Sequence, residues 1–228
     1  MIFISVDSIF NMSEEILSPT FVYRFSVPIL QTKLKWNPVG VRLGQEYQLP
    51  DLTSIDKRKT FATVRVAWAS NGLFFDIAVA GKLQQPWCRD SRLEDSDAIQ
   101  IWIDTRNTQN IHRASRFCHR FLLMPLGAGP TKNEPFSTML KINRAREESR
   151  NINAERIPVM SEVTTTGYRL CTFLPSQTMS GYDPLEQSKI GFTYAISDRE
   201  LGCQSFTVGQ EFPFNEDPSL WGTLELQP

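Results

Sequence analysis

The chain has 228 residues, of which 24 are Lys or Arg and 25 are Asp or Glu, so its formal net charge at pH 7 is -1. This balance argues against a protein that captures nucleic acid or an anionic membrane through broad positive charge. A hydrophobic share of 41% excludes a disordered chain, and the longest apolar runs are too short to span a bilayer.

Aromatic residues are the compositional feature that indicates a fold class. The chain contains 15 Phe, 5 Tyr and 5 Trp, and they are spread along its whole length. Because aromatic and β-branched side chains fit half-buried pleated surfaces, this composition favours β-strands. A length of 228 residues is normal for one β-sandwich, so we expect residues 1–228 to form a single domain.

The first ten residues, MIFISVDSIF, are apolar enough to suggest a signal peptide. No basic residue precedes the run, Asp7 interrupts it, and no clear small-residue cleavage site follows. We therefore predict that it is not a signal peptide, which favours a cytoplasmic location. An alternative start is Met12, with residues 1–11 an artefact of start-site choice.

The first predicted strand covers residues 21–27. Its sequence FVYRFSV alternates apolar and polar side chains, and we expect Pro28 to end it. Residues 29–60 contain several glycines and the charged run DKRK, which indicates an irregular connection. We expect this N-terminal part to be an extension of the domain.

The strongest local signal is a β-hairpin. Residues 61–69 and 73–80 read FATVRVAWA and LFFDIAVA, and Ser70-Asn71-Gly72 lies between them. Asn-Gly readily supplies the positive φ angles of tight turns, so the sequence predicts two paired strands here.

The next predicted strand follows a long loop over residues 81–97. The sequence AIQIWID, residues 98–104, places its three isoleucines on one face and Gln100 and Trp102 on the other. The isoleucine face is expected to belong to the core.

The rest of the chain favours short strands separated by turns. We expect them at CHRFLLM (118–124), FSTMLKI (136–142), IPVMSEVT (157–164), YRLCTFL (168–174), IGFTYAIS (190–197), QSFTVG (204–209) and GTLEL (222–226). One or two short helices are expected, near 141–150 and 184–188. This pattern predicts an all-β protein, an antiparallel, jelly-roll-like β-sandwich.

The four cysteines are Cys88, Cys118, Cys171 and Cys203, and they form no CxxC pair. Their spacing indicates neither a zinc ribbon nor a redox motif. We expect free, core-facing thiols, with a disulfide as the alternative, because the sequence does not give connectivity.

Motifs of the common enzyme classes are absent from the sequence. It contains no GxSxG, HExxH, P-loop or GxGxxG pattern. Its two histidines, His112 and His119, lie at either end of a polar loop, where a surface or hydrogen-bonding role is usual. We predict that the protein is not an enzyme.

Acidic side chains gather just before and after the predicted strand 98–104. Glu94, Asp95, Asp97 and Asp104 suit a calcium ion, which prefers hard oxygen ligands, a carboxylate pair for general acid–base catalysis, or a solvated loop. These interpretations stay open, because only the fold can make several ligands converge.

Three aromatic residues lie outside clear strand periodicity. Trp87 lies between a proline and charged residues, and Phe212 and Phe214 lie in the segment EFPFNEDPSLW. Such rings either fill the core or stack on the apolar C–H face of a sugar.

Seven segments follow one another in an order that carries a family resemblance. They are VRVAWASNGLFFDIAV, PW, DSDAIQIWID, CHRFLLM, GYRLCTFLP, IGFTYAISD and DPSLWGTLEL, over about residues 61–226. The order resembles that of the carbohydrate-binding modules of family nine and the related DOMON-like sandwiches. The resemblance implies a non-catalytic, jelly-roll-like β-sandwich that holds a sugar between two tryptophans, with structural calcium nearby.

The resemblance also implies roles for individual residues. Trp87 matches one tryptophan of the sugar clamp, and Phe214 stands at the second clamp position in place of a tryptophan. Arg120 falls at a sugar-binding arginine, Gln100 replaces a usual glutamate, and the polar residue expected near Leu122 is apolar. The predicted ligand-binding residues are therefore Trp87, Gln100, Arg120 and Phe214.

Asp97 and Asp104 occupy the acidic strand that follows the clamp tryptophan in the family. The resemblance makes them candidate ligands of a structural calcium ion. No other cofactor is implied for the carbohydrate-binding modules.

Three functional hypotheses follow. The first is binding of an oligosaccharide or polysaccharide, with no nucleic-acid or membrane partner. The second is a stand-alone sandwich that acts as an interaction or scaffold protein. The third is a DOMON-type haem or redox binder, which needs an axial pair such as His119 with Met124. Fold transfers between relatives more readily than ligand does.

Overall fold

The computed structural model describes residues 25–52, 59–149, 157–206, 209 and 211–228. Within these ranges the chain forms two stacked β-sheets, and none of the described residues lies in an α-helix. Most of the predicted first strand and the alternative start at Met12 lie outside the described residues. No helix in these ranges is long and apolar enough to span a membrane.

The larger sheet has seven strands in the order β1-β11-β9-β4-β5-β6, with β10 paired to β9. Only β1 and β11 run parallel to each other; the other pairs are antiparallel. The strands are β1 (Ser26–Leu30), β4 (Ala98–Asp104), β5 (Cys118–Ala128), β6 (Glu134–Leu140), β9 (Lys189–Asp198), β10 (Gly202–Ser205) and β11 (Gly222–Gln227).

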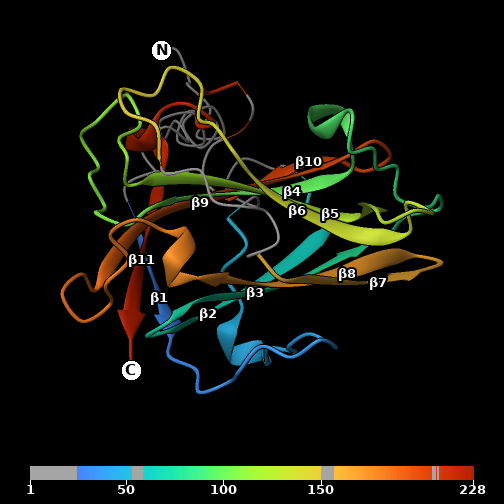
Figure 1. Ribbon diagram of the computed structural model, residues 1–228, viewed down its shortest axis with the longest axis horizontal. Helices are drawn as coiled ribbons and strands as arrows, with labels where there is room; N and C mark the ends of the chain where they lie inside the picture. Colours follow the sequence, from blue (N-terminus) through green and yellow to red (C-terminus); the bar gives the residue numbers. More distant parts are fainter. Residues whose placement is uncertain (1–24, 53–58, 150–156, 207–208, 210) are drawn as a thin grey trace, which may run out of the picture.

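The smaller sheet is antiparallel and has the order β2-β3-β8-β7. Its strands are β2 (Ala62–Ala69), β3 (Gly72–Ala80), β7 (Val159–Thr164) and β8 (Gly167–Pro175). In Figure 1 the two sheets lie one over the other, with β4, β5, β6 and β9 in one layer and β2, β3, β7 and β8 in the other. The predicted all-β sandwich is confirmed.

The one or two short helices predicted near 141–150 and 184–188 do not form in the described residues of these segments. Residues 141–149 form turns, and the backbone N–H of Arg146 donates to the carbonyl oxygen of Ala114 at 2.8 Å. Helical turns in the described chain are instead 3-10 segments of three residues each. They are η2 (Gln45–Tyr47), η4 (Leu93–Asp95), η6 (Ser176–Thr178) and η7 (Pro218–Leu220).

Pro28 does not end a strand, contrary to the prediction. It lies in the middle of β1, opposite Glu225 of β11. Because β1 is at the edge of the sheet, the missing proline N–H costs no ladder hydrogen bond on its outer side. Val27 and Ile29, on either side of it, are buried in the core, so this N-terminal segment belongs to the sandwich.

The hairpin of β2 and β3 is confirmed, but its glycine has a different role from the predicted one. Ala69 pairs with Gly72, so Ser70 and Asn71 form the turn, and neither has a positive φ. Gly72 has a φ of +151°, and a Cβ there would collide with the carbonyl oxygen of Leu174 in β8. Glycine is required by this close approach.

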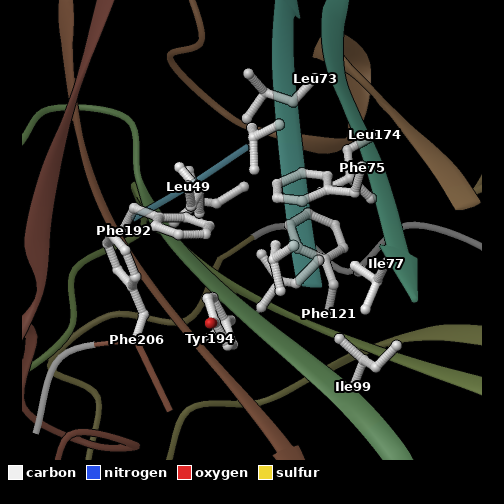
Figure 2. Close-up of a cluster of buried hydrophobic side chains, with 14 of the residues drawn as sticks. Leu49, Leu73, Phe75, Ile77, Ile99, Phe121, Leu174, Phe192, Tyr194 and Phe206 are labelled. Atoms are coloured by element: carbon white, nitrogen blue, oxygen red, sulfur yellow. The ribbon is translucent and has the colours of Figure 1, made fainter. Parts of the chain in front are cut away.

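The core lies between the two sheets. Figure 2 shows Leu73 and Phe75 of β3 among side chains of the opposite sheet, including Phe121 and Phe192. The rings of Phe75 and Phe192 stack across the interface with centroids 6.0 Å apart. The isoleucines of β4 also point into this core, as predicted, so the alternate residues of β4 lie on the outer face of the larger sheet.

Leu73 is fully buried in this core, whereas Leu185 is 87% exposed, so the same substitution at the two positions tests the packing. We expect Leu73→Ala to lower the free energy of unfolding by about 2–5 kcal/mol, because it leaves a cavity. Leu185→Ala should change it by no more than about 0.5 kcal/mol. Urea unfolding of both variants measures the difference, and equal effects would contradict this placement of the core.

Candidate functional site

The outer face of the larger sheet carries two polar residues between two apolar clusters. One cluster is built around Trp102 and Phe214, and the other contains Leu122. Gln100 of β4 and Arg120 of β5 lie between them, where the alternation of each strand turns every second side chain away from the core. The apolar residue near position 122 is thereby explained, since Leu122 is fully buried in its cluster.

Gln100 and Arg120 are joined by two hydrogen bonds. The Nε and Nη2 atoms of Arg120 donate to Oε1 of Gln100 at 2.9 and 2.6 Å. The guanidinium also donates to the carbonyl oxygen of Lys141 at 3.3 Å and lies 5.5 Å from the ring centroid of Trp102. These contacts occupy the oxygen of the Gln100 amide and leave its NH₂ group as a donor.

Burial lowers the pKa of Arg120, and the carboxylate of Glu94, 3.5 Å from Nη2, opposes that shift. An arginine side chain stays protonated in proteins, so this guanidinium is a fixed, largely buried positive charge on the sheet.

A hollow of 320 Å³ opens above this pair and is called the Gln100 hollow below. It is lined by Gln100, Trp102, Arg120, Ala195, Ser197, Phe212, Phe214 and Asn215. The arrangement combines aromatic side chains with convergent amide, hydroxyl and guanidinium groups, as sites for small polar ligands do.

The Phe214 ring is held in the wall of the hollow. It is 5% exposed and packs edge-on against Trp102, with centroids 5.6 Å apart and planes at 86°. The indole N–H of Trp221 donates to the carbonyl oxygen of Phe214 at 2.6 Å. Phe212 is less buried and lines the same hollow, so it is the more accessible of the two rings.

Trp87 lies at a different place. It lines a separate hollow of 270 Å³, the Trp87 hollow, together with Lys82, Gln84, Gln85, Asp97, Arg199 and Glu200. The guanidinium carbons of Arg89 and Arg199 lie over the indole ring, 4.8 and 4.3 Å from its centroid. The structure therefore brings Gln100, Arg120 and Phe214 together and places Trp87 outside their hollow.

Asp97 is part of a buried ion cluster. Its Oδ2 accepts from Nζ of Lys82 at 3.1 Å and from the backbone N–H of Trp87 at 3.0 Å, and its Oδ1 accepts from the N–H of Arg199 at 2.9 Å. The Lys82 ammonium also donates to Asp198 at 2.5 Å. Burial alone lowers the pKa of Lys82, but its hydrogen bonds to Asp198 and Asp97 outweigh burial, so this pKa is raised.

Asp104 lies at the other end of β4. Its oxygens accept from the backbone N–H groups of Arg106 and Thr108 at 3.0 and 2.6 Å, and burial raises its pKa despite these bonds. At about 3.3 Å per residue, Asp97 and Asp104 are about 23 Å apart along the strand.

The two predicted calcium ligands do not fit one ion. The separation of Asp97 from Asp104 prevents shared coordination, and an ammonium already provides the positive charge beside Asp97. Among the described residues no group of three or more His, Cys, Asp or Glu is arranged to hold a metal.

The axial pair proposed for haem is not formed. His119 and Met124 are an odd number of residues apart on β5, so they lie on opposite faces of the sheet. His119 stacks against Phe121 on the core side, whereas Met124 packs with Leu122 on the outer side. No single haem can be ligated by both.

None of the four cysteines forms a disulfide in the structure. Cys118 and Cys171 are buried, and Cys88 and Cys203 are half-buried. Burial raises the pKa of Cys88 and of Cys118 to about 12, so both are neutral at physiological pH and poor nucleophiles.

Sequence reasoning missed Lys82 entirely and did not carry Phe212 into the predicted site. A lysine directly after a strand usually lies in solvent, and nothing local marks Lys82 as 2% exposed. The spacing of Phe212 from Phe214 does not reveal which ring is held in the wall and which is accessible.

Comparison with known proteins gives a family match and a structural match. Residues 45–228 match the family model described as "Carbohydrate family 9 binding domain-like". Two solved structures of a carbohydrate binding module family 9 from Caldicellulosiruptor kristjanssonii are similar, one in complex with cellotriose and one with glucose. Comparison with curated protein sequences finds no significant match.

The structural similarity extends over most of both chains. The cellotriose complex has a TM-score of 0.59 and 11% identity, covering 89% of this chain and 93% of the other. The glucose complex has a TM-score of 0.58 and 11% identity, covering 89% and 95%. At this identity the likeness shows the fold.

Removal of the buried ammonium tests the ion cluster. We expect Lys82→Met to lower the free energy of unfolding by about 3–5 kcal/mol, because Asp97 and Asp198 are then buried without a counter-charge. Lys189 pairs with Glu225 at the surface, so Lys189→Met should cost no more than about 1 kcal/mol. Equal losses in urea unfolding would show that the cluster is not buried.

His119 predicts a pH-dependent stability. Burial lowers its pKa from 6.5 to about 4, so below about pH 6.5 the unfolded chain binds a proton that the folded chain excludes. Stability is therefore lost as the pH falls from about 6.5 to about 4, by roughly 3 kcal/mol in total.

Urea unfolding between pH 7 and pH 4 measures this loss. His119→Leu should remove most of the His119 contribution, whereas His112→Leu, at an exposed position, should keep it. A wild-type slope in the His119 variant would contradict the assignment.

Proposed function

Because the chain belongs to the carbohydrate family 9 binding domain-like family, we propose that it is a non-catalytic protein that binds carbohydrate in the Gln100 hollow. The observation that carries the proposal is the hydrogen-bonded Gln100–Arg120 pair beneath a hollow with phenylalanine side chains in its lining. The volume of 320 Å³ is at the lower end of the range of small-ligand pockets, which suits a ligand of one or two rings.

The chemistry of the lining matches that of a sugar. A sugar hydroxyl both donates and accepts, and the hollow offers the NH₂ of Gln100, the amide of Asn215, the hydroxyl of Ser197 and the Arg120 guanidinium. The more accessible Phe212 ring supplies an apolar surface for the C–H face of the sugar. All of these groups can serve to bind and orient a sugar, and none of them is required to react with it.

Neutral glucans are the first ligands to test. Two of the similar solved structures are complexes, one with cellotriose and one with glucose, and a chain of net charge -1 has no broad field that selects a polyanion. The alternative role as an interaction or scaffold protein stays a prediction, because no feature of the described residues specifically favours it.

Substitution of the arginine tests the site. We expect calorimetry to detect cellotriose binding to the wild type and Arg120→Met to weaken it at least about ten-fold, since a charged hydrogen-bond donor is lost. Arg42 is an exposed arginine paired with Glu162, so Arg42→Met is the matched control and should bind as the wild type does. Thermal unfolding verifies that both variants are folded.

Two results would contradict the proposal. One is an absence of binding to cello- and xylo-oligosaccharides by the wild type. The other is cellotriose binding that folded Arg120→Met retains unchanged, which would place the ligand elsewhere on the protein.

A further inference from the structure

The Trp87 hollow has equal numbers of acidic and basic side chains, but the basic ones are the more accessible at its surface. Three carboxylates lie there or just beneath it, those of Asp97, Asp198 and Glu200. Against them stand Lys82 and the two arginines at the indole, Arg89 and Arg199, so the formal charges balance. The orientation of these six side chains decides whether a ligand in the hollow meets positive or negative charge.

The carboxylates are occupied by the protein itself. Asp97 and Asp198 are bound to the Lys82 ammonium and to backbone N–H groups, and their side chains are at most 1% exposed. Glu200 accepts from the N–H groups of Leu83 and Gln84 at 2.8 and 3.1 Å. Little of this negative charge is available to a ligand.

The two arginines have no such partners. Both are exposed, and among the described residues no carboxylate lies within salt-bridge distance of either guanidinium. Both lie over the indole of Trp87, an arrangement in which cation–π attraction limits the freedom of the side chain. Trp87 thus acts as a platform that positions two donor groups.

A guanidinium is suited to one kind of ligand group. Its planar set of N–H donors matches a carboxylate or a sulfate, which it can bind through two parallel hydrogen bonds. The amides of Gln84 and Gln85 in the same lining provide further polar groups beside the arginines.

The linings of the Trp87 hollow and the Gln100 hollow are linked through a third hollow. A third hollow of 220 Å³ shares Ser197 with the Gln100 hollow and Arg199 with the Trp87 hollow. Ser197 is the second-to-last residue of β9, and Arg199 directly follows the strand. The end of β9 therefore contributes residues to all three hollows, and Glu94 and Asp95 line the middle one.

We propose that the Trp87 hollow is a second subsite, which binds an acidic sugar unit through Arg89 and Arg199. The ligand class is an oligosaccharide with a neutral unit in the Gln100 hollow and a carboxylate-bearing unit at Trp87. The inference rests on the proposed function for its neutral end, and it gives Trp87 a positioning role in place of a stacking one.

The test compares two ligands that differ only in charge. Cellotriose and cellotriose with the C6 hydroxymethyl group of one terminal unit oxidised to a carboxylate are titrated into the full chain by calorimetry at low ionic strength. We expect the oxidised form to bind at least about ten-fold more tightly, which is about 1.4 kcal/mol. Added salt should reduce this preference, because exposed charges are screened.

The variants locate the preference. In Arg199→Gln and in Arg89→Gln the ratio of the two affinities should fall towards one, whereas the exposed Arg42→Gln should keep the wild-type ratio. Inorganic sulfate is the third probe, and sulfate binding as tight as that of oxidised cellotriose would overturn the assignment to a sugar.

The remaining outcomes separate the two proposals. Equal binding of both trisaccharides by the wild type would overturn the acidic subsite and leave the carbohydrate function standing. A preference that both glutamine variants retain would also overturn it. If neither trisaccharide binds, the carbohydrate function fails and this inference fails with it.

Discussion

The alternation of side chains along β4 and β5 is the constraint on which the candidate site depends. Each strand must bury every second residue between the sheets, so Ile99, Ile101 and Phe121 are fixed in the core. Gln100 and Arg120 are then forced onto the outer face, in strands whose register the core packing sets. A slip of one residue would bury the guanidinium among isoleucines and expose the core, which explains why the polar pair is so firmly placed.

The ion cluster around Lys82 adds a second fixed point. It ties the two ends of the loop between β3 and β4 to each other and to the turn between β9 and β10, which is distant in the sequence. Because a buried charge is costly without its partner, these segments hold one another in place. Trp87 and Arg199 both donate their backbone N–H to Asp97, so the cluster brings the two backbones together, and the Arg199 guanidinium lies 4.3 Å from the indole centroid.

Local sequence patterns predicted most strands correctly, but they failed for the predicted helices and for Pro28. Alternation located β4, and the Ser70-Asn71-Gly72 turn between two apolar runs located β2 and β3. The predicted helices failed because tertiary hydrogen bonds, such as that of Arg146 to Ala114, satisfy the backbone without a helix. Pro28 was misread because its tolerance depends on β1 being an edge strand, which is a property of the whole sheet.

The sequence by itself determined the fold class and the succession of strands along the chain, and its resemblance to a family made Gln100, Arg120 and Phe214 candidate ligand contacts. Periodicity and turn chemistry are local, so they can be read along the chain. Only the tertiary structure decided that those three residues share one hollow, that Trp87 lies in another, and that a lysine stands beside the predicted calcium ligand Asp97. These facts depend on how distant segments pack, and no local pattern records the side on which a loop side chain comes to rest.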